Sequence, residues 1–420
     1  MKHLIIRNVG PIENVDIELK RFNFLIGPQS SGKSTVAKIL STCTWVEKEV
    51  LTTLNDKAIA DGDVFLRLLE KFHKIEGYFS EKSVVIFETE NITIAFADGN
   101  LDVKSKNTET YHREKICYIP AERNMVTLPE LQGFEFGQTN LRSFLFDWFY
   151  AREYYVPENK TDILNLGVRY YYDSEQLKQK DRIEHVNGNP YRIALASASS
   201  GLQSVVPLLV MLQYYTGEYF HSYEEKISFD GGKRTKDILT VLLDKYVLKK
   251  IKPNLVGEER GIIMEQVTEG LKRERSKYLP LMSNYFEAYS RLLIPERSTF
   301  IIEEPEQNLY PSTQMDLLDL LVTLCKGERK RKRKHGFTIT THSPYILNRL
   351  NLLVKRFDAG AVDEANLEWD EIAVWAVENG EVCDLKLKNT HLVNPEYLSK
   401  PLDYIYDQYE QYEQDRKSFK

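Results

Sequence analysis

The feature that most restricts what this chain can fold into is the loop at residues 27–35, with the sequence GPQSSGKST. It fits the pattern G-x-x-x-x-G-K-[ST], follows an apolar run at 22–26, and precedes apolar positions at helical spacing that begin at Val36. Gly27 and Gly32 let the backbone curl so that consecutive N–H groups converge on an anion, next to the positive end of the helix. A chance glycine-serine turn is the alternative, but the flanking elements and the Lys-Ser pair disfavour it. The loop therefore predicts an α/β fold that binds phosphate groups.

Two side chains of this loop are expected to act on a bound nucleotide. Lys33 reaches the β- and γ-phosphates, and the hydroxyl of Ser34 is a ligand for Mg²⁺. The loop residues expected to contact the nucleotide are Gly27, Ser30, Ser31, Gly32, Lys33, Ser34 and Thr35.

Length and charge set limits on the architecture and on the partners. At about 150 residues per domain, 420 residues suggest two or three domains or lobes, and 42% hydrophobic with 28% charged residues is an ordinary globular composition. The 56 Lys and Arg residues against 62 Asp and Glu residues give a net charge of −6, so the chain has no overall basic coat for nucleic acid. Any contact with a polyanion must be local.

Cysteine usage and apolar runs predict the compartment. The four cysteines lie far apart, without a C-x-x-C pair, so neither a disulfide framework nor a zinc site is expected. The apolar run at residues 4–6 is too short for a signal peptide, and those at 205–212 and 317–325 are shorter than the roughly 18 residues of a membrane span. We expect a soluble, cytoplasmic protein with no membrane partner.

Hydrophobic periodicity predicts sheet strands at both ends of the chain. Alternating or short apolar runs predict strands at 3–7, 15–19, 22–26, 83–103 with a hairpin turn at 98–100, 115–119, 298–302 and 337–341. Helical spacing predicts helices at 36–72, 262–293 and 311–324, the second without sustained heptads. A hairpin is expected at 374–387 around Asn379-Gly380, followed by a helix.

The middle of the chain is rich in Tyr and Phe, at 134–172 and 213–223, with helical patches between Gly, Asn and Pro breaks. We interpret it as a largely helical insertion whose aromatic residues serve mainly core and interface packing. The expected architecture is therefore one α/β sheet, mixed or parallel with antiparallel N-terminal strands, interrupted by this lobe. The expected units are 1–118, 119–296, 297–390 and a C-terminal helical tail at 391–420.

A second acidic motif, FIIEEP at residues 300–305, is an apolar strand that ends in two adjacent carboxylates. This arrangement can hold a Mg²⁺-bound water and polarise an attacking water. Glu303 is the candidate on the metal side and Glu304 the candidate general base. A solvated acidic strand end is the alternative, which the phosphate loop in the same chain disfavours.

A third strand end carries the sequence TTHSP at residues 340–344. A lone histidine is more often structural than catalytic. At a strand end of a phosphate-loop sheet, however, His342 can sense the γ-phosphate by hydrogen bonding.

Residues 199–203, SSGLQ, complete an ordered set of motifs: the phosphate loop, S-S-G-x-Q, E-E-P-E and T-T-H-S-P. This order resembles the ABC-type ATPases of the RecF/SMC class, and within them the OLD-like ATPases, whose strand ends read E-E-P-E-x-x-L-x-P. The resemblance extends from Met1 to about Pro344.

The resemblance implies an ATPase whose sites are completed by a second protomer. Ser200 and Gly201, with Gln203, would contact the nucleotide of the opposite protomer, so that ATP and Mg²⁺ are enclosed between two heads of a homodimer or higher oligomer. The residues around Asn308 would cross to the other subunit, and His342 would be the switch histidine.

The chain departs from the family pattern at several positions. Ser199 and Leu202 replace residues of the common L-S-G-G-Q, and Glu303 replaces the common Asp, which bears on the turnover rate more than on binding. Gln29 replaces a frequent Asn, a change that we interpret as neutral.

Two further segments keep alternative interpretations. The sequence IPAERN at 119–124 resembles a segment of OLD-like ATPases and could couple nucleotide to lobe movement, or form a buried Glu122–Arg123 pair at the junction. The basic run KGERKRKRK at 326–334 is expected on a surface loop, either as a solvated face or as a contact for DNA phosphates or an acidic protein.

OLD-family nucleases continue into a Toprim domain, and the 76 residues after Pro344 are too few for one. We therefore expect a stand-alone ATPase switch that controls a separate effector, a nuclease or toxin, as in bacterial anti-phage defence. A RecF-type DNA-repair ATPase that binds DNA is the second hypothesis, and a nucleotide-gated scaffold with little hydrolysis is the third. A transport-coupled ATPase is least favoured, because the aromatic insertion and the E-E-P-E pattern suit the soluble branch.

Overall fold

The computed structural model describes residues 2–56, 59, 61–128, 137–221, 233–254, 259–327, 333–361 and 365–418. At its centre the described residues form an 11-stranded sheet with the order β6-β5-β4-β1-β2-β15-β14-β3-β13-β12-β7. Its strands are β1 (Lys2–Val9), β2 (Ile12–Leu19), β3 (Phe22–Ile26), β4 (Val84–Glu88), β5 (Ile92–Ala97), β6 (Asn100–Ser105), β7 (Glu114–Ile119), β12 (Arg297–Glu303), β13 (Gly336–Thr341), β14 (Ile372–Glu378) and β15 (Glu381–Asp384).

The sheet has an antiparallel part and a parallel part. Strands β2, β1, β4, β5 and β6 pair antiparallel, whereas β14, β3, β13, β12 and β7 pair parallel in that order. The predicted α/β class with antiparallel N-terminal strands is thus confirmed. Because the carboxyl ends of parallel strands meet at one edge, the loops after β3, β13, β12 and β7 lie together there.

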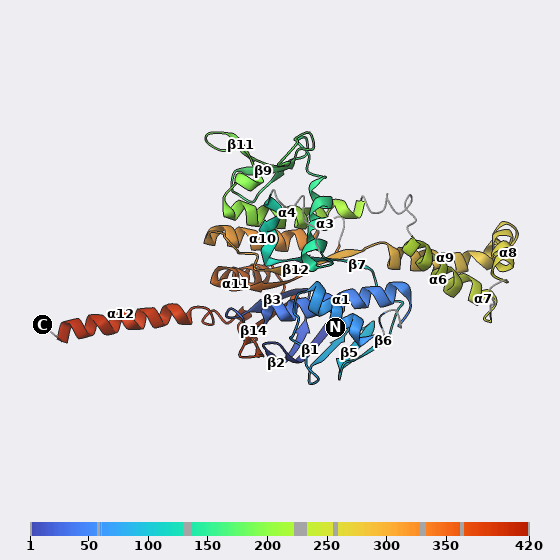
Figure 1. Ribbon diagram of the computed structural model, residues 1–420, viewed down its shortest axis with the longest axis horizontal. Coiled ribbons are helices and arrows are strands. Elements are labelled where there is room, and N and C mark those ends of the chain that lie inside the picture. The colour runs from blue at the N-terminus through green and yellow to red at the C-terminus, as the bar shows by residue number, and fades with distance from the viewer. Residues whose placement is uncertain are drawn as a thin grey trace.

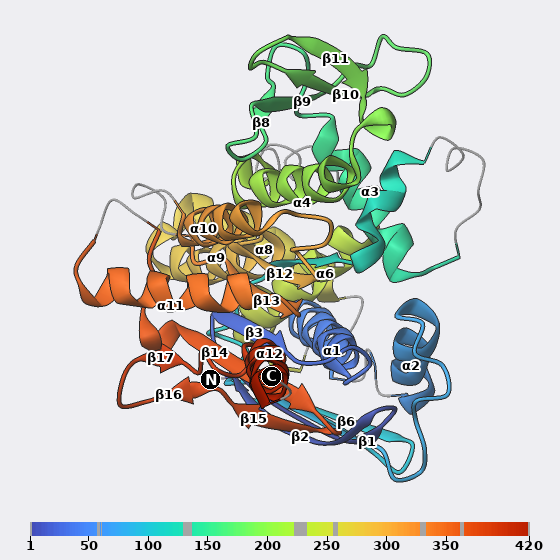
Figure 2. The same cartoon turned by 90° about the vertical axis from the view of Figure 1, so that its left-hand side faces the viewer.

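Helices cover both faces of the parallel strands (Figures 1 and 2). In β3 the alternating residues Phe22, Phe24 and Ile26 pack toward one face, and Leu25 packs toward the other. The second face is covered by α1 (Lys33–Thr53), which is followed by α2 (Gly62–Arg67) and the π-helical turn η1 (Leu68–Phe72). The helices on the first face are α3 (Asn140–Arg152), α4 (Ser200–Thr216), α10 (Pro311–Lys326) and α11 (Pro344–Asp358).

The middle of the chain is less helical than its sequence suggested. Between α3 and α4, residues 161–194 form a four-stranded antiparallel sheet of β8 (Thr161–Asp162), β9 (Val168–Tyr172), β10 (Asp181–His185) and β11 (Tyr191–Ala194). The prediction of helical patches was therefore wrong over this stretch. Asn187-Gly188 lies in the turn between β10 and β11 and was the local hairpin signal that the prediction did not use.

A helical arm projects from the body after α4 (Figure 1). It contains α6 (Lys233–Leu243), η5 (Asp244–Leu248), α7 (Lys249–Ile251), α8 (Glu259–Arg273) and α9 (Arg275–Leu293). A small core of its own consists of Val247, Leu248, Ile263 and Val267. The helices predicted at 262–293 correspond to α8 and α9.

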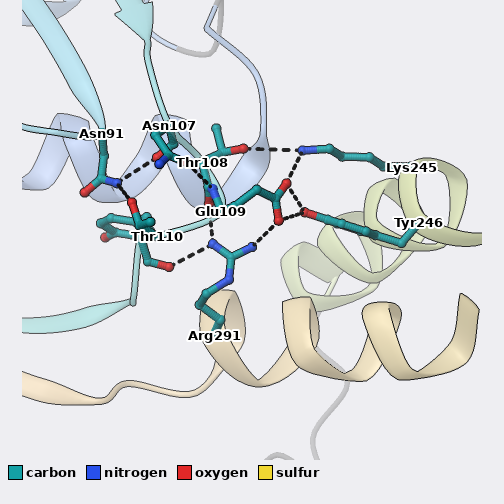
Figure 3. Close-up of polar contacts among 9 residues, drawn as sticks. Asn91, Asn107, Thr108, Glu109, Thr110, Lys245, Tyr246 and Arg291 are labelled. Carbon is teal, nitrogen blue, oxygen red and sulfur yellow. Dashed lines mark hydrogen bonds and ion pairs between the residues drawn. The ribbon is translucent and has the colours of Figure 1, made fainter. Parts of the chain in front are cut away.

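The base of the arm is tied to the loop that precedes β7, as Figure 3 shows. Arg291 of α9 donates hydrogen bonds to the carbonyl oxygens of Thr108 and Tyr111, the latter at 2.9 Å, and its other terminal nitrogen lies 3.4 Å from Glu109. Glu109 also accepts a hydrogen bond of 2.9 Å from the Tyr246 hydroxyl. The arm is therefore anchored to the sheet at its root.

At the C-terminal end the predicted hairpin at 374–387 is present as β14 and β15. A short pair, β16 (Lys386–Leu387) and β17 (Leu392–Val393), precedes α12 (Lys400–Ser418), which extends away from the body (Figure 1). Within the described ranges, no helix is long and apolar enough to span a bilayer. Residues 328–332, the centre of the predicted basic run, lie outside the described residues, and the boundaries predicted between the four units stay predictions.

Candidate nucleotide site

The phosphate loop joins β3 to α1 and has the backbone conformations that its glycines allow. Gly32 has φ 103° and directly precedes α1, and Ser30 has φ 58°. A Cβ atom at Gly27 would lie 2.2 Å from the carbonyl oxygen of Val377 in β14, so only glycine fits there. The loop is thus held between a neighbouring strand and the N-terminus of a 21-residue helix.

Lys33 folds over this loop. Its side chain is buried, and Nζ donates hydrogen bonds to the carbonyl oxygens of Gly27 at 3.0 Å and Pro28 at 2.6 Å. Burial lowers the pKa of Lys33, and the carboxylates of Glu304 and Glu306 act in the opposite direction. A phosphate group at the loop would add negative charge beside this cation and favour its charged form.

Glu303 is the last residue of β12 and lies on the face that α1 covers, because it is two residues beyond Ile301 of that core. It is buried. Its carboxylate accepts a hydrogen bond of 2.5 Å from the Tyr118 hydroxyl and a longer one, 3.4 Å, from the N–H of Ala121. The carboxylate is thus fixed in place beside the phosphate-loop helix.

Glu304 begins the loop after β12 with φ 42°, an uncommon conformation for a non-glycine residue. Its N–H donates to the carbonyl of Thr340 in β13, at 3.0 Å. The carboxylate is partly exposed and lies 3.6 Å from Nε2 of His342. His342 is the main cause of a lowered pKa at Glu304; burial acts against it, and Lys33 contributes in the same direction as His342. Glu304 is therefore ionised at neutral pH and next to the predicted γ-phosphate sensor.

Glu306 is a site residue to which the sequence analysis gave no role. Its Oε1 accepts hydrogen bonds of 2.7 Å from the Thr341 hydroxyl and from the N–H of His342. Its Oε2 is buried and has no hydrogen-bond partner among the described residues. Burial raises the pKa of Glu306. The third acid of the E-E-P-E pattern was the available signal, and this carboxyl group positions the backbone of His342.

Arg123 is the second residue whose role the sequence did not show. Its side chain is fully buried, and it donates hydrogen bonds to the carbonyl oxygens of Ser204 (2.9 Å), Glu303 (2.9 Å) and Glu304 (2.8 Å). Burial lowers its pKa to about 10. Glu122 is exposed, so the buried Glu122–Arg123 pair considered above is not formed. Arg123 fixes the junction through backbone carbonyls instead.

The predicted signature lies at the start of α4. Ser199 caps this helix by accepting a hydrogen bond of 3.4 Å from the N–H of Leu202. Gln203 donates to the carbonyls of Ala196 and Ala198, at 2.9 and 3.1 Å, so its amide is turned toward its own chain.

Gly201 and Ser204 pack against the loop that follows the carboxylate strand. A Cβ atom at Gly201 would lie 2.9 Å from the carbonyl oxygen of Asn308, whose side chain donates to the Ser204 hydroxyl at 2.9 Å. The two ribbon views place α4 and α1 on opposite sides of the sheet (Figures 1 and 2). Within the described part of the chain, no hydrogen bond or ion pair joins Ser200 or Gly201 to the phosphate loop. The structure thus brings Lys33, Glu304 and His342 together and leaves the signature on the other face.

The donor set suits a magnesium ion that is held partly by phosphate. Among the described residues, no group of three or more His, Cys, Asp or Glu side chains could form a metal cage. Mg²⁺ is commonly bound through one or two protein oxygens together with substrate phosphates and water. Ser34 at the start of α1 and the fixed carboxylate of Glu303 can supply such a pair.

Fold and loop together define an α/β protein with a G-x-x-x-x-G-K-[ST] loop at the carboxyl edge of its parallel strands. No protein-family model matches the chain, and no curated protein matches it. Among solved structures, it is similar to an SMC head domain from Thermotoga maritima, with 9% identity, a TM-score of 0.36, and coverage of 91% of this chain and 97% of that one.

Two further solved structures also match over most of the chain. The recombination mediator RecF in its ATPrS form has 10% identity and a TM-score of 0.30, and the match covers 91% of this chain and 97% of that chain. A dimeric bacterial ABC transporter cassette has 12% identity and a TM-score of 0.27, covering 90% and 96%. Similarity at this level says nothing about activity, so a function can be inferred only from the residues of the site itself.

Proposed function

We propose that the chain is an ABC-type ATPase that binds ATP and Mg²⁺ at the phosphate loop and hydrolyses the nucleotide. The observation that carries this proposal is the convergence of Lys33, Glu304 and His342 at the carboxyl ends of the adjacent strands β3, β12 and β13. Lys33 would bind the β- and γ-phosphates, Glu304 would orient and deprotonate the attacking water, and His342 would contact the γ-phosphate. Glu303 and Ser34 would hold the metal with its waters.

We further propose that each nucleotide-binding site is completed by residues of a second copy of the chain. Ser200 and Gly201 lie at the exposed start of α4, on the face of the sheet away from α1, and Gly201 abuts Asn308 after the carboxylate strand. In a head-to-head dimer they would cap the nucleotide of the partner. Gln203 already bonds its own chain, so it is a weaker candidate for a nucleotide contact.

The experiment that tests the composite site combines two inactive variants. Ser200→Arg should leave ATP binding at the phosphate loop intact while bulk and charge block the contact in trans, and Lys33→Ala removes the cation of the loop. Mixed chains should regain part of the hydrolysis rate, because one heterodimer site is then complete. As a matched control, a chain with both substitutions mixed with wild type tests subunit exchange. Absence of recovery, with heterodimers demonstrated, would argue for a site complete within one chain.

The biological task proposed for this ATPase is control of a separate cytoplasmic effector, a nuclease or toxin, in anti-phage defence. The support is the E-E-P-E and T-T-H-S-P pattern of the OLD-like branch. Purification of the complex from its native operon tests the proposal: a nuclease or toxin bound in an ATP-dependent way supports it. Tight, salt-dependent binding of the purified ATPase to duplex DNA without such a partner would favour the RecF-type alternative.

A further inference from the structure

Helix α12 extends away from the body of the protein (Figures 1 and 2). Its described side chains at residues 403–413 are all exposed, and none of them belongs to a hydrophobic cluster of the described residues. Even alanine-rich helices shorter than about 12–15 residues are marginal in water, and α12 has 19 residues with no alanine among them. Because helices in proteins are stabilised mainly by packing of an apolar face, we expect α12 to pack on a partner.

One face of α12 carries a row of large side chains, Ile405, Tyr409 and Tyr412, which we call the tyrosine stripe. These residues recur at the spacing i, i+4, i+7, so they lie on one face of the helix. Their exposed fractions are 46%, 64% and 74%. Tyr406 flanks the stripe, and its ring centroid lies 6.3 Å from that of Tyr409. Exposed apolar residues that stand singly are common, whereas a continuous row of them marks an interaction surface.

The opposite face of α12 is acidic. Asp403, Asp407 and Glu410 recur at the same i, i+4, i+7 spacing, roughly half a turn around the helix axis from the tyrosine stripe. Residues 403–413 contain one more carboxylate, Glu413, and no Lys or Arg. Such a helix is repelled by nucleic acid and by anionic lipid surfaces. A basic partner at the stripe would not contact the acidic face either, so the occupant of the stripe has to be matched by its apolar side chains.

We propose that the tyrosine stripe pairs with the tyrosine stripe of a second copy of the chain. In this arrangement the two acidic faces point outward into water, so the contact does not bring their carboxylates together. Tyrosine rings can pack edge to face while their hydroxyl groups stay at the wet rim of the contact. Tyr409 lies in the middle of the stripe, so it faces its counterpart whether the two helices run parallel or antiparallel. The pairing requires no nucleotide, and it is distinct from the proposed head-to-head contact.

The size of the contact determines how strong the pairing can be. If the stripe and Tyr406 of each copy bury roughly 100 Å² per side chain, the contact covers roughly 800 Å² in total. This area lies at the lower end of specific protein interfaces, where association is weak and transient. We therefore expect one copy and two copies to be in equilibrium at micromolar concentrations.

Sedimentation equilibrium of the full chain without nucleotide tests the pairing. The wild type should shift from one copy to two between about 1 and about 100 µM. Tyr409→Glu should weaken this association about tenfold or more, because it places two carboxylates face to face in the middle of the contact. The matched control is Gln411→Glu, which adds the same charge to α12 outside the stripe and should associate like wild type. Without nucleotide, the result does not depend on the proposed ATPase function.

A mixing experiment separates pairing of two stripes from docking of the stripe on the body of a second copy. Fluorescently labelled wild type is sedimented with an excess of unlabelled chains that carry both Tyr409→Glu and Tyr412→Glu, which keep the body but lack the stripe. We expect the labelled chain to remain a single copy, whereas unlabelled wild type should bring it to two. Labelled wild type that binds the double variant as tightly as it binds wild type would overturn the paired stripes. Wild type that does not associate at about 100 µM, or association that Tyr409→Glu leaves unchanged, would also overturn the proposal.

Discussion

Replacing Arg123 with methionine should destabilise the protein by about 3 kcal/mol. Methionine has a similar length, but it leaves the carbonyl oxygens of Ser204, Glu303 and Glu304 without their donor. Three lost hydrogen bonds to a charged group cost about 2 kcal/mol each. Removing the buried cation also removes its desolvation cost, which offsets about 3 kcal/mol, as judged from a pKa of Arg123 lowered from 12.5 to about 10. The cost of the three lost hydrogen bonds is therefore larger than the gain from removing the charge, and the variant is less stable.

The assay is urea unfolding followed by tryptophan fluorescence, with hydrolysis measured in parallel. Arg123→Lys keeps the charge and part of the hydrogen bonding, so its midpoint should fall between wild type and Arg123→Met. Arg169→Met is the control: this arginine is 46% exposed and pairs with Asp162, and its loss should cost less than about 0.5 kcal/mol. An Arg123→Met protein within about 1 kcal/mol of wild type would refute the reasoning.

Three further perturbations follow from the site and the sheet. Lys33→Ala should weaken ATP binding at least about a hundredfold in calorimetry, because the loop loses its cation; unchanged affinity would contradict the assignment of the loop. Glu304→Gln should retain ATP and form a trapped dimer visible by light scattering while hydrolysis slows by about 10²-fold or more, and a wild-type rate would reassign the base. Glu114→Gln should cost about 2–3 kcal/mol at pH 7, because Lys2 and Arg297 outweigh burial and lower the Glu114 pKa to about 2. Because the Glu114 pKa is lower in the folded than in the unfolded protein, where it is near 4.3, the ionised carboxylate stabilises the fold above about pH 4.3 and loses this effect toward pH 2. The difference in urea midpoint between wild type and Glu114→Gln should therefore shrink between pH 5 and pH 3. A difference that stays constant over this range would count against the pairing of Glu114 with Lys2 and Arg297.

The sequence predicted those parts of the fold that depend on short stretches of neighbouring residues. The phosphate loop, the strands on each side of the insertion and the Asn379-Gly380 hairpin depend on residues adjacent in sequence, and they occur where predicted. The four-stranded sheet at residues 161–194 was missed because tyrosine-rich, polar strands of two to five residues have little periodicity. The turn at Asn187-Gly188 was informative, but the aromatic density around it was interpreted as helix packing.

In the candidate site, too, the residues that lie in short motifs could be predicted, and the residue with distant partners could not. Lys33, Glu303, Glu304 and His342 could be proposed from the sequence because each lies at, or directly after, the end of a strand or at the start of a helix within a short motif. The role of Arg123 was left open because the carbonyl groups of Ser204, Glu303 and Glu304, to which it donates, are 81 to 181 residues away in sequence. No local rule places a buried guanidinium on carbonyls at that separation.

The Arg123 contacts also explain how the site can respond as one unit. Through Arg123, the end of the carboxylate strand β12 is bonded to the first turns of α4, where the proposed trans contact begins. The same strand pairs in parallel with β7, and both enter the sheet from the root of the helical arm, where Arg113 donates to the Leu293 carbonyl at 2.8 Å. We expect a displacement of the arm to reach Glu303 along two paired strands, and to reach α4 through Arg123 together with the hydrogen bond from Asn308 to the Ser204 hydroxyl. Since packed strands transmit displacement with little compression, we expect the arm and the proposed dimer face to be connected mechanically through the segment that carries Glu303 and Glu304.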